Sequence, residues 1–218
     1  KRQPLSIARR DLESVHPRGY HEAFSRDRLT RPEQRRIGLP ATRPLVQRTW
    51  LAVGGTLLTA RLALKRGLAS HLAGGTHHAH PCFGSGFCIF NDCAVAARVL
   101  LGTGEVRRIL IVDLDVHQGD GSEACFQHDP RVTTLSVHAA SNFPLRKVKS
   151  DIDIPLEDAT GDDDYLAAIG DKLPQVLDEQ QPDLVLFNAG VDPHREDRLG
   201  RLELSDAGLL RRDRLVLD

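Results

Sequence analysis

One stretch, residues 109–121 with the sequence ILIVDLDVHQGDG, constrains the chain more than any other. It reads as an apolar strand that ends in acidic and histidine side chains. Side chains alternate across a strand, so Asp113, Asp115 and His117 would share one face. Two carboxylates at the end of a buried strand repel each other and lose hydration unless a cation lies among them. We therefore favour a bound metal ion; in the alternative, Asp113 and Asp120 cap turns and His117 packs in the core.

Apolar runs and helical patterns alternate along the chain. Runs rich in Val, Ile or Leu predict buried parallel strands at residues 108–115, 132–138 and 183–188. Residues 56–66, 91–101 and 163–180 have helical patterns, the N-terminal third looks mostly helical, and Pro174 is expected to kink or interrupt its helix. This alternation predicts an α/β fold with a parallel sheet, whose ligands bind beyond the carboxyl ends of the strands.

Length and composition suit one domain over residues 1–218, and with Lys1 first and no Met anywhere we expect a fragment. No apolar run approaches the roughly 20 residues of a membrane helix, so no membrane partner is expected. Four cysteines without paired spacing favour a reducing cytoplasm. A net charge of −1 argues against direct nucleic-acid binding. The first fifty residues hold 12 Lys or Arg against 5 Asp or Glu, which predicts a solvated or salt-bridged face or, alternatively, contact with an acidic partner.

Two further motifs carry candidate functional residues. The segment GGTHHA places His77 and His78 after a glycine pair, and a loop of this kind can direct both imidazoles toward one cleft for acid-base work. The nearby His80 is given little weight. The segment NAGVD places Asp192 just past an apolar strand, where it could complete a metal site with Asp115 and His117. Taken alone, a surface histidine pair or a helix cap explains these motifs equally well or better.

Together the motifs resemble the histone deacetylase family of the arginase-deacetylase fold, most closely its class IV and bacterial members. The resemblance rests on GGTHHA (74–79), GSGFCIFND (84–92), DLDVHQGDG (113–121), Ser136 through NFP (142–144) and SDIDI (150–154), and AGVDPHREDRLGRL (189–202). It implies a three-layer α/β/α architecture with a central, mostly parallel sheet. It also implies that the C-terminal part, and some N-terminal part, of the domain is missing.

The same resemblance implies roles for individual residues. Zinc would be bound by Asp115, His117 and Asp192, and His77 and His78 would form the acid-base pair, oriented by Asp113 and Asp120. Gly86, Phe87 and Phe143 would line a narrow substrate tunnel, although composition alone favours ordinary core phenylalanines. A structural potassium ion would be held by Asp113, Asp115, Ser136 and the backbone carbonyls of His117 and Val137.

The implied reaction is zinc-dependent removal of an acetyl or other acyl group from an amine, with acetyl-lysine in proteins as the first candidate. The family also uses a tyrosine hydroxyl to stabilise the intermediate, and neither Tyr20 nor Tyr165 lies in a matching motif; we expect that tyrosine beyond Asp218. A weak or inactive pseudo-deacetylase that binds acyl-lysine or a partner is therefore an alternative. A ureohydrolase is a third reading, but its second Asp-rich motif for two manganese ions is not found.

Overall fold

The computed structural model describes residues 4–218, and contacts between residues divide them into two compact units. The first unit holds the described residues up to Arg107 together with Asp120–Phe126. The second holds Arg108–Gly119 and Gln127–Asp218. A single domain over residues 1–218 stays a prediction.

The first unit is helical, as the sequence of the N-terminal third predicts. Its described helices are α1 (Arg9–Leu12), α2 (Arg18–Ser25), α3 (Arg31–Ile37), α4 (Arg43–Arg66), α5 (Asp92–Thr103) and α6 (Asp120–Phe126). Helix α4 begins well before the expected residue 56, because Thr42 caps its first turn and the glycines at 54 and 55 do not end it. A side chain at Gly54 would collide with the backbone of Leu5. Glycine lowers the intrinsic stability of the helix here, but it allows the backbone of Leu5 to pack closely against it.

Aromatic rings form the centre of the first unit. Phe90 is 1% exposed, and its ring lies within 5.2–5.9 Å of the rings of His16, Tyr20, Phe24 and Trp50. Edge-on and tilted pairs of this kind add stability beyond their buried area. Phe90 immediately precedes Asn91, the N-cap of α5, so this packing helps to position the residues at the start of that helix.

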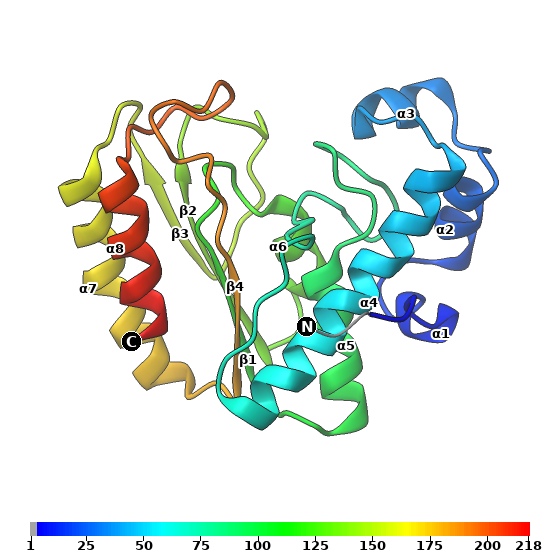
Figure 1. The fold of residues 1–218 in the computed structure, drawn as a ribbon, viewed down its shortest axis with the longest axis horizontal. Helices are drawn as coiled ribbons and strands as arrows, with labels where there is room; N and C mark the ends of the chain where they lie inside the picture. The colour runs from blue at the N-terminus through cyan, green and yellow to red at the C-terminus, as the bar shows by residue number, and fades with distance from the viewer. Residues whose placement is uncertain (1–3) are drawn as a thin grey trace. The chain divides into compact units, whose positions relative to one another are not determined.

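The second unit contains a parallel sheet. Among the described residues its strands are β1 (Ile109–Asp113), β2 (Val132–Ala139), β3 (Ile152–Leu156) and β4 (Leu184–Asn188), in the order β3-β2-β1-β4. Helices α7 (Asp162–Gln180) and α8 (Asp206–Leu217) lie side by side on one side of the sheet (Figure 1). The predicted α/β class and parallel sheet are confirmed. Strand β3 was not predicted, because it carries Pro155, which a strand at the edge of a sheet tolerates.

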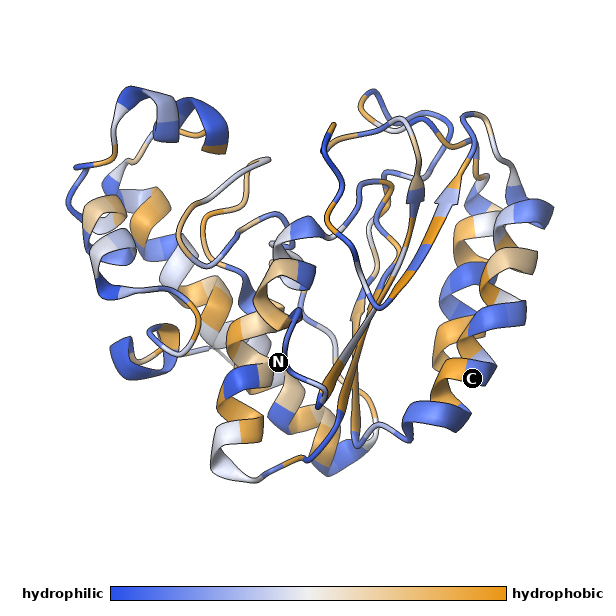
Figure 2. Ribbon diagram, turned by 180° about the vertical axis from the view of Figure 1, so that it is seen from behind, coloured by the Kyte–Doolittle hydropathy of each residue, from blue (hydrophilic) through white to orange (hydrophobic). Residues whose placement is uncertain are grey.

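Alternate residues of the first strand and its extension build the core of the second unit. Leu110, Val112, Leu114 and Val116 are each 0% exposed and belong to one hydrophobic cluster with α7 residues such as Ile169. Figure 2 shows hydrophobic residues along the strands and on α7 and α8, interrupted on the helices by hydrophilic ones. The strand itself ends at Asp113, before the expected residue 115, yet the inside-outside alternation continues to Val116.

Pro174 does not interrupt its helix, because α7 runs unbroken to Gln180, and the alternative expectation of a kink stays a prediction. A proline removes the hydrogen bond to the carbonyl four residues earlier. Pro174 is exposed, so water can hydrate the carbonyl of Gly170 that loses this bond.

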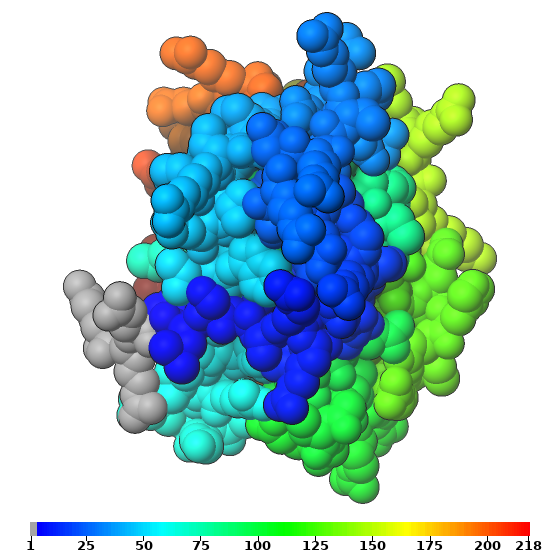
Figure 3. All heavy atoms as spheres, turned by 90° about the vertical axis from the view of Figure 1, so that its right-hand side faces the viewer, coloured from blue at the N-terminus to red at the C-terminus, as the bar shows by residue number. Residues whose placement is uncertain are grey.

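Basic residues of the N-terminal helices lie at the surface, where this blue-to-cyan segment forms much of the face shown in Figure 3. Arg9 and Arg18 both pair with Glu22, at 3.6 and 2.9 Å, as a salt-bridged face would. Contact with an acidic partner stays a prediction. Separately, no helix among the described residues is both long and apolar enough to cross a bilayer.

Candidate functional site

The second unit brings together the predicted metal ligands. Asp115, His117 and Asp192 each offer a ligand atom, and these atoms lie within 4.8 Å of one another. Asp115 and His117 follow β1, and Asp192 follows the neighbouring parallel strand β4. The carboxyl ends of adjacent parallel strands meet at one edge of a sheet, which is why residues so distant in sequence converge. We call residues 114–117 and 189–192 the metal loops.

The imidazole of His117 lies between the two carboxylates. Its Nδ1 is 2.9 Å from Oδ1 of Asp115 and 3.1 Å from Oδ2 of Asp192. Burial acts to lower the pKa of His117, but the hydrogen bonds and charges of the two carboxylates outweigh burial and raise this pKa to about 9. Burial, together with the charge of Asp115, raises the pKa of Asp192. Electrostatics in this cluster therefore favour positive charge among the oxygens.

Backbone groups and one glycine position the metal loops against each other. The Val116 amide donates to Oδ1 of Asp192 at 3.0 Å. A Cβ at Gly190 would lie 2.7 Å from Oδ2 of Asp115 and 2.9 Å from Oδ1 of Asp192. Only glycine leaves room for the two carboxylates at this point. The NAG motif is visible in the sequence, but the sequence alone indicates no role for Gly190.

Asp113 is buried at the end of β1, next to Ser136 of β2, and both residues are expected at the second cation. Its Oδ1 accepts from the side-chain amide of Asn188 at 2.9 Å, and its strand register pairs it with Ser136. The Ser136 hydroxyl lies 3.0 Å from Nδ1 of His138. Val137 follows Ser136 in β2. These positions are consistent with a cation site, which stays a prediction, and Asn188 is a neighbour that sequence reasoning missed.

The first unit holds the histidine loop, residues 74–79. His77 and His78 are both buried, and their ring centroids lie 4.0 Å apart. Nδ1 of His78 lies 2.6 Å from Oδ1 of Asp120, and Nε2 of His80 lies 2.9 Å from Oδ2 of the same carboxylate. Burial acts to raise the pKa of Asp120, but the hydrogen bonds to both histidines outweigh it and lower the pKa to about 2. Asp120 therefore orients His78, and His80 takes a larger part than the sequence indicated.

The start of α5 also holds the histidine loop, through two adjacent side chains. Asp92, 1% exposed, accepts hydrogen bonds from the amides of Gly75 and Thr76 and from the hydroxyls of Thr56 and Thr76, at 2.5–3.1 Å. Asn91 donates to the carbonyls of His77 and Ala79 at 3.4 and 3.3 Å.

Both residues lie in the GSGFCIFND motif, but the sequence did not predict that they hold the histidine loop. An Asn-Asp pair before an apolar helix looks like an ordinary helix cap, and Asn91 does serve as one for Ala94. The contacts with the histidine loop join residues distant in sequence, so only the fold reveals them.

The expected tunnel residues are at the surface of their own units. Phe87 is 58% exposed and Phe143 is 40% exposed, so neither is an ordinary core phenylalanine. Gly86 and Phe87 both have positive φ, and their amides donate to the carbonyls of Arg36 and Ile37. The Phe143 ring centroid lies 6.5 Å from that of His117. The tunnel itself stays a prediction, because Phe87 and Phe143 belong to different units.

Both tyrosines of the chain are engaged elsewhere. Tyr20 donates its hydroxyl to the carbonyl of Ile89 at 2.7 Å, and Tyr165 donates to the carbonyl of Leu114 at 3.4 Å. Burial raises the pKa of both phenols. Neither tyrosine is placed to donate to a reaction intermediate, in agreement with the sequence motifs.

Comparison with known proteins gives a consistent result. A family model described as the histone deacetylase domain matches residues 2–218. An uncharacterized protein of Picosynechococcus sp. is 53% identical over 215 residues, which cover 99% of this chain and 72% of that protein. Histone deacetylase 2 of Arabidopsis thaliana is 34% identical over 224 residues, which cover 98% of this chain and 58% of that protein.

Solved structures agree with this result. The crystal structure of an HDAC homologue complexed with SAHA matches with a TM-score of 0.86 and 26% identity, over 98% of this chain and 63% of that one. The chain thus spans less than two thirds of this homologue and of the Arabidopsis protein. On the family match, the sequence identity and the shared fold, the chain belongs to the histone deacetylase family.

Proposed function

We propose that this chain carries the zinc ligands and the acid-base residues of a deacetylase that hydrolyses the amide bond of an N-acylated amine, with acetyl-lysine in proteins as its substrate. The convergence of Asp115, His117 and Asp192 is the observation that carries the proposal. Two carboxylates and one imidazole form a donor set that zinc accepts in hydrolytic sites while keeping one position open. Membership of the histone deacetylase family supports the same reaction.

A zinc ion bound by these residues would act as a Lewis acid toward the acyl carbonyl and would lower the pKa of water. The remaining work is assigned to the histidine loop. Because Nδ1 of His78 is hydrogen-bonded to Asp120, Nε2 is the nitrogen through which His78 would hand over a proton. One histidine of the pair would accept a proton from the attacking water, and one would protonate the amine as the carbon-nitrogen bond breaks.

The other expected site residues complete the proposal. Phe87 and Phe143 would form apolar walls for the lysine stem, with Gly86 beside them, and the exposure of both rings supports this role. A potassium ion near Asp113, Asp115, Ser136 and the carbonyls of His117 and Val137 would offset the negative charge at the end of β1. The adjacent register of Asp113 and Ser136 supports that position.

A binding module with weak turnover is the second candidate, and the two tyrosines favour it. Their hydroxyls are donated to backbone carbonyls, so neither supplies the donor that stabilises the tetrahedral intermediate. Loss of such a donor typically lowers kcat by about 10²- to 10³-fold. Because the chain spans 58% of its Arabidopsis relative, the activity of the whole protein is likewise a proposal.

The test combines metal analysis with turnover. We expect one zinc ion per chain and hydrolysis of an acetyl-lysine peptide, both lost in Asp192→Asn and both retained in Asp163→Asn, a matched change at an exposed residue of the same unit. Tight binding of SAHA without turnover would favour the binding module. Two manganese ions per chain would favour a ureohydrolase, and the absence of metal binding would contradict the proposal.

A further inference from the structure

An arginine is buried inside the second unit, on the helix next to the metal loops. Arg212 of α8 is 1% exposed, although arginine is among the residues least often buried. Its Nε and Nη2 both donate to Oδ1 of Asp213, at 2.9 and 2.7 Å. This ion pair offsets the charge, but a well-packed apolar side chain would avoid the desolvation altogether. The remaining guanidinium nitrogen gives the arginine a more specific role.

Nη1 of Arg212 joins the two metal loops. It donates to the carbonyl of Leu114 at 3.2 Å and to the carbonyl of Gly190 at 2.5 Å. Leu114 immediately precedes Asp115, and Gly190 lies two residues before Asp192. One nitrogen therefore contacts the backbone next to a ligand from β1 and next to a ligand from β4. We call this pair of hydrogen bonds the Arg212 bridge.

Only the planar guanidinium suits these contacts. Lysine has a compact ammonium on a flexible stem, and it cannot bond Asp213 through two donors while a third donor reaches both carbonyls in a fixed plane. Methionine would fill the volume but would leave the two carbonyls without a shared donor. Tyr165 also donates to the carbonyl of Leu114, and its phenol is hydrogen-bonded to the Arg212 side chain, so it belongs to the same network.

We propose that Arg212 is a positioning residue for the metal centre, because its bridge sets the spacing of the two metal loops and thereby the distance between their ligands. This inference rests on the proposed function, in which Asp115, His117 and Asp192 hold zinc. Residues that orient metal ligands from behind typically change metal affinity by about 10- to 100-fold when replaced. The Arg212 bridge acts on the ligand-bearing backbone rather than on the ligand side chains.

The test is the zinc affinity of the whole chain, measured by competition with a chromophoric chelator. We expect Arg212→Met to weaken zinc binding about 10- to 100-fold. Arg212→Lys, which keeps the charge but not the fork, should weaken it by a similar factor.

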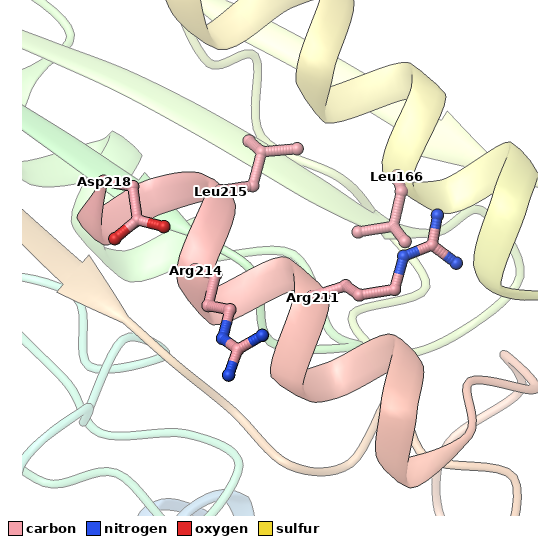
Figure 4. Close-up of a pocket in the computed structure, with 5 residues that line it drawn as sticks. All are labelled: Leu166, Arg211, Arg214, Leu215 and Asp218. Atoms are coloured by element: carbon pink, nitrogen blue, oxygen red, sulfur yellow. The ribbon is translucent and has the colours of Figure 1, made fainter.

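Two controls separate bridging from general packing. Arg211→Met changes the neighbouring arginine, which lines the groove between α7 and α8 (Figure 4) and pairs with Asp163 at the surface. Ile169→Val removes one methyl group from the core of the same unit and leaves the donors to both loop carbonyls in place. Both controls should retain the zinc affinity of the wild type within about threefold, as expected for a small loss of packing or of a surface ion pair.

The outcomes separate the two ideas. If the wild type binds zinc and folded Arg212→Met binds it equally well, the bridge has no positioning role, and the proposed function stands. If Arg212→Met fails to fold, Arg212→Lys decides by the same criterion. If the wild type binds no zinc, both the proposed function and the bridge are overturned. Loss of affinity in Arg212→Met matched by Ile169→Val would indicate loosened packing and would also overturn the bridge.

Discussion

The histidine loop and the metal loops are stabilised by different kinds of contact. The histidine loop is held by hydrogen bonds to side chains at the starts of two helices: Asn91, the N-cap of α5, Asp92 of α5 and Asp120 of α6. The metal loops extend from the ends of adjacent parallel strands and are joined by Gly190 and Arg212. Strand register brings the proposed metal ligands together, whereas the histidine loop depends largely on hydrogen bonds to side chains. The first region should therefore respond sharply to single substitutions that leave the second region unchanged.

The largest effect is expected from His78→Ala, which should lower turnover and leave zinc binding unchanged. Removing a proton-transfer group typically lowers kcat by about 10²- to 10⁴-fold. Because the metal ligands all lie in the second unit, zinc affinity should remain that of the wild type. Turnover of an acetyl-lysine peptide and zinc competition, measured on the same sample, check both halves. A loss of zinc binding equal to the loss of turnover would contradict the division of labour.

A smaller but still large effect is expected from the Asp92 contacts. Asp92→Asn replaces an oxygen that accepts hydrogen bonds with an amide that donates them, so the histidine loop should shift. A displacement of about 1 Å can lower kcat by about 10²-fold while KM stays nearly constant. The measurement is kcat per site, with the folded fraction determined from tryptophan fluorescence, which discounts molecules that have not folded.

Substitutions at Thr56 test the same contacts more gently, because the Thr56 hydroxyl is a hydrogen-bond partner of Asp92. Its hydroxyl lies 2.5 Å from Oδ2 of Asp92, so Thr56→Val should lower kcat per site and Thr56→Ser should restore it. Thr103→Val removes a threonine hydroxyl near the far end of α5 and serves as the matched control. Equal kcat per site in Thr56→Val and Thr56→Ser would show that the hydroxyl does not position the loop.

Acid should weaken the first unit through His16. Burial is the main cause that lowers its pKa from 6.5 to about 4, and its Nε2 accepts from the amide of Asn91 at 2.9 Å. Since the unfolded chain binds this proton at higher pH than the folded chain, stability is lost as pH falls from about 6.5 toward 4. At pH 5 the loss should be about 2 kcal/mol.

The single tryptophan makes this loss measurable. Trp50 lies in α4 and packs against Phe90, so urea unfolding followed by its fluorescence reports on the first unit. His16→Gln should flatten the dependence on pH between 7 and 5. An unchanged slope in this variant would assign the acid sensitivity to another group.

The smallest effect is expected at His80. In His80→Phe the ring can still stack on Phe83, from which it lies 4.4 Å, but the hydrogen bond to Asp120 is lost. The pKa of Asp120 should rise from about 2, yet the carboxylate would stay ionised near neutral pH. We expect kcat to change by about fivefold or less, in line with one hydrogen bond. A change as large as that in His78→Ala would make His80 a full member of the acid-base group.

The convergence of Asp115, His117 and Asp192 could be predicted from the sequence, because their positions follow from periodicity and strand ends. Alternation along residues 110–116 separates the core side chains from Asp113 and Asp115, and parallel strands lead Asp192 to the same edge. The roles of Asn91, Asp92 and Arg212 depend on contacts between distant segments, which local patterns do not encode. An arginine in an amphipathic helix looks like any exposed one until its burial is known.

The errors in element prediction have equally physical causes. Local rules treat proline as a helix breaker, but the exposed position of Pro174 makes the lost hydrogen bond tolerable. Strand β3 (Ile152–Leu156) is as long as β1 and β4, but Asp153 and Pro155 interrupt its apolar residues, so it lacks the continuous apolar run by which those strands are recognised.

Helix α6 belongs to the first unit although it is encoded between two segments of the second. The chain leaves the second unit after Gly119, places Asp120 beside His78 of the histidine loop, and returns at Gln127. No single cut in the gene can therefore yield both units intact. A recombination event that exchanged only the N-terminal segment would pair a foreign His78 with the resident Asp120, so the histidine and the carboxylate that orients it would come from different parents.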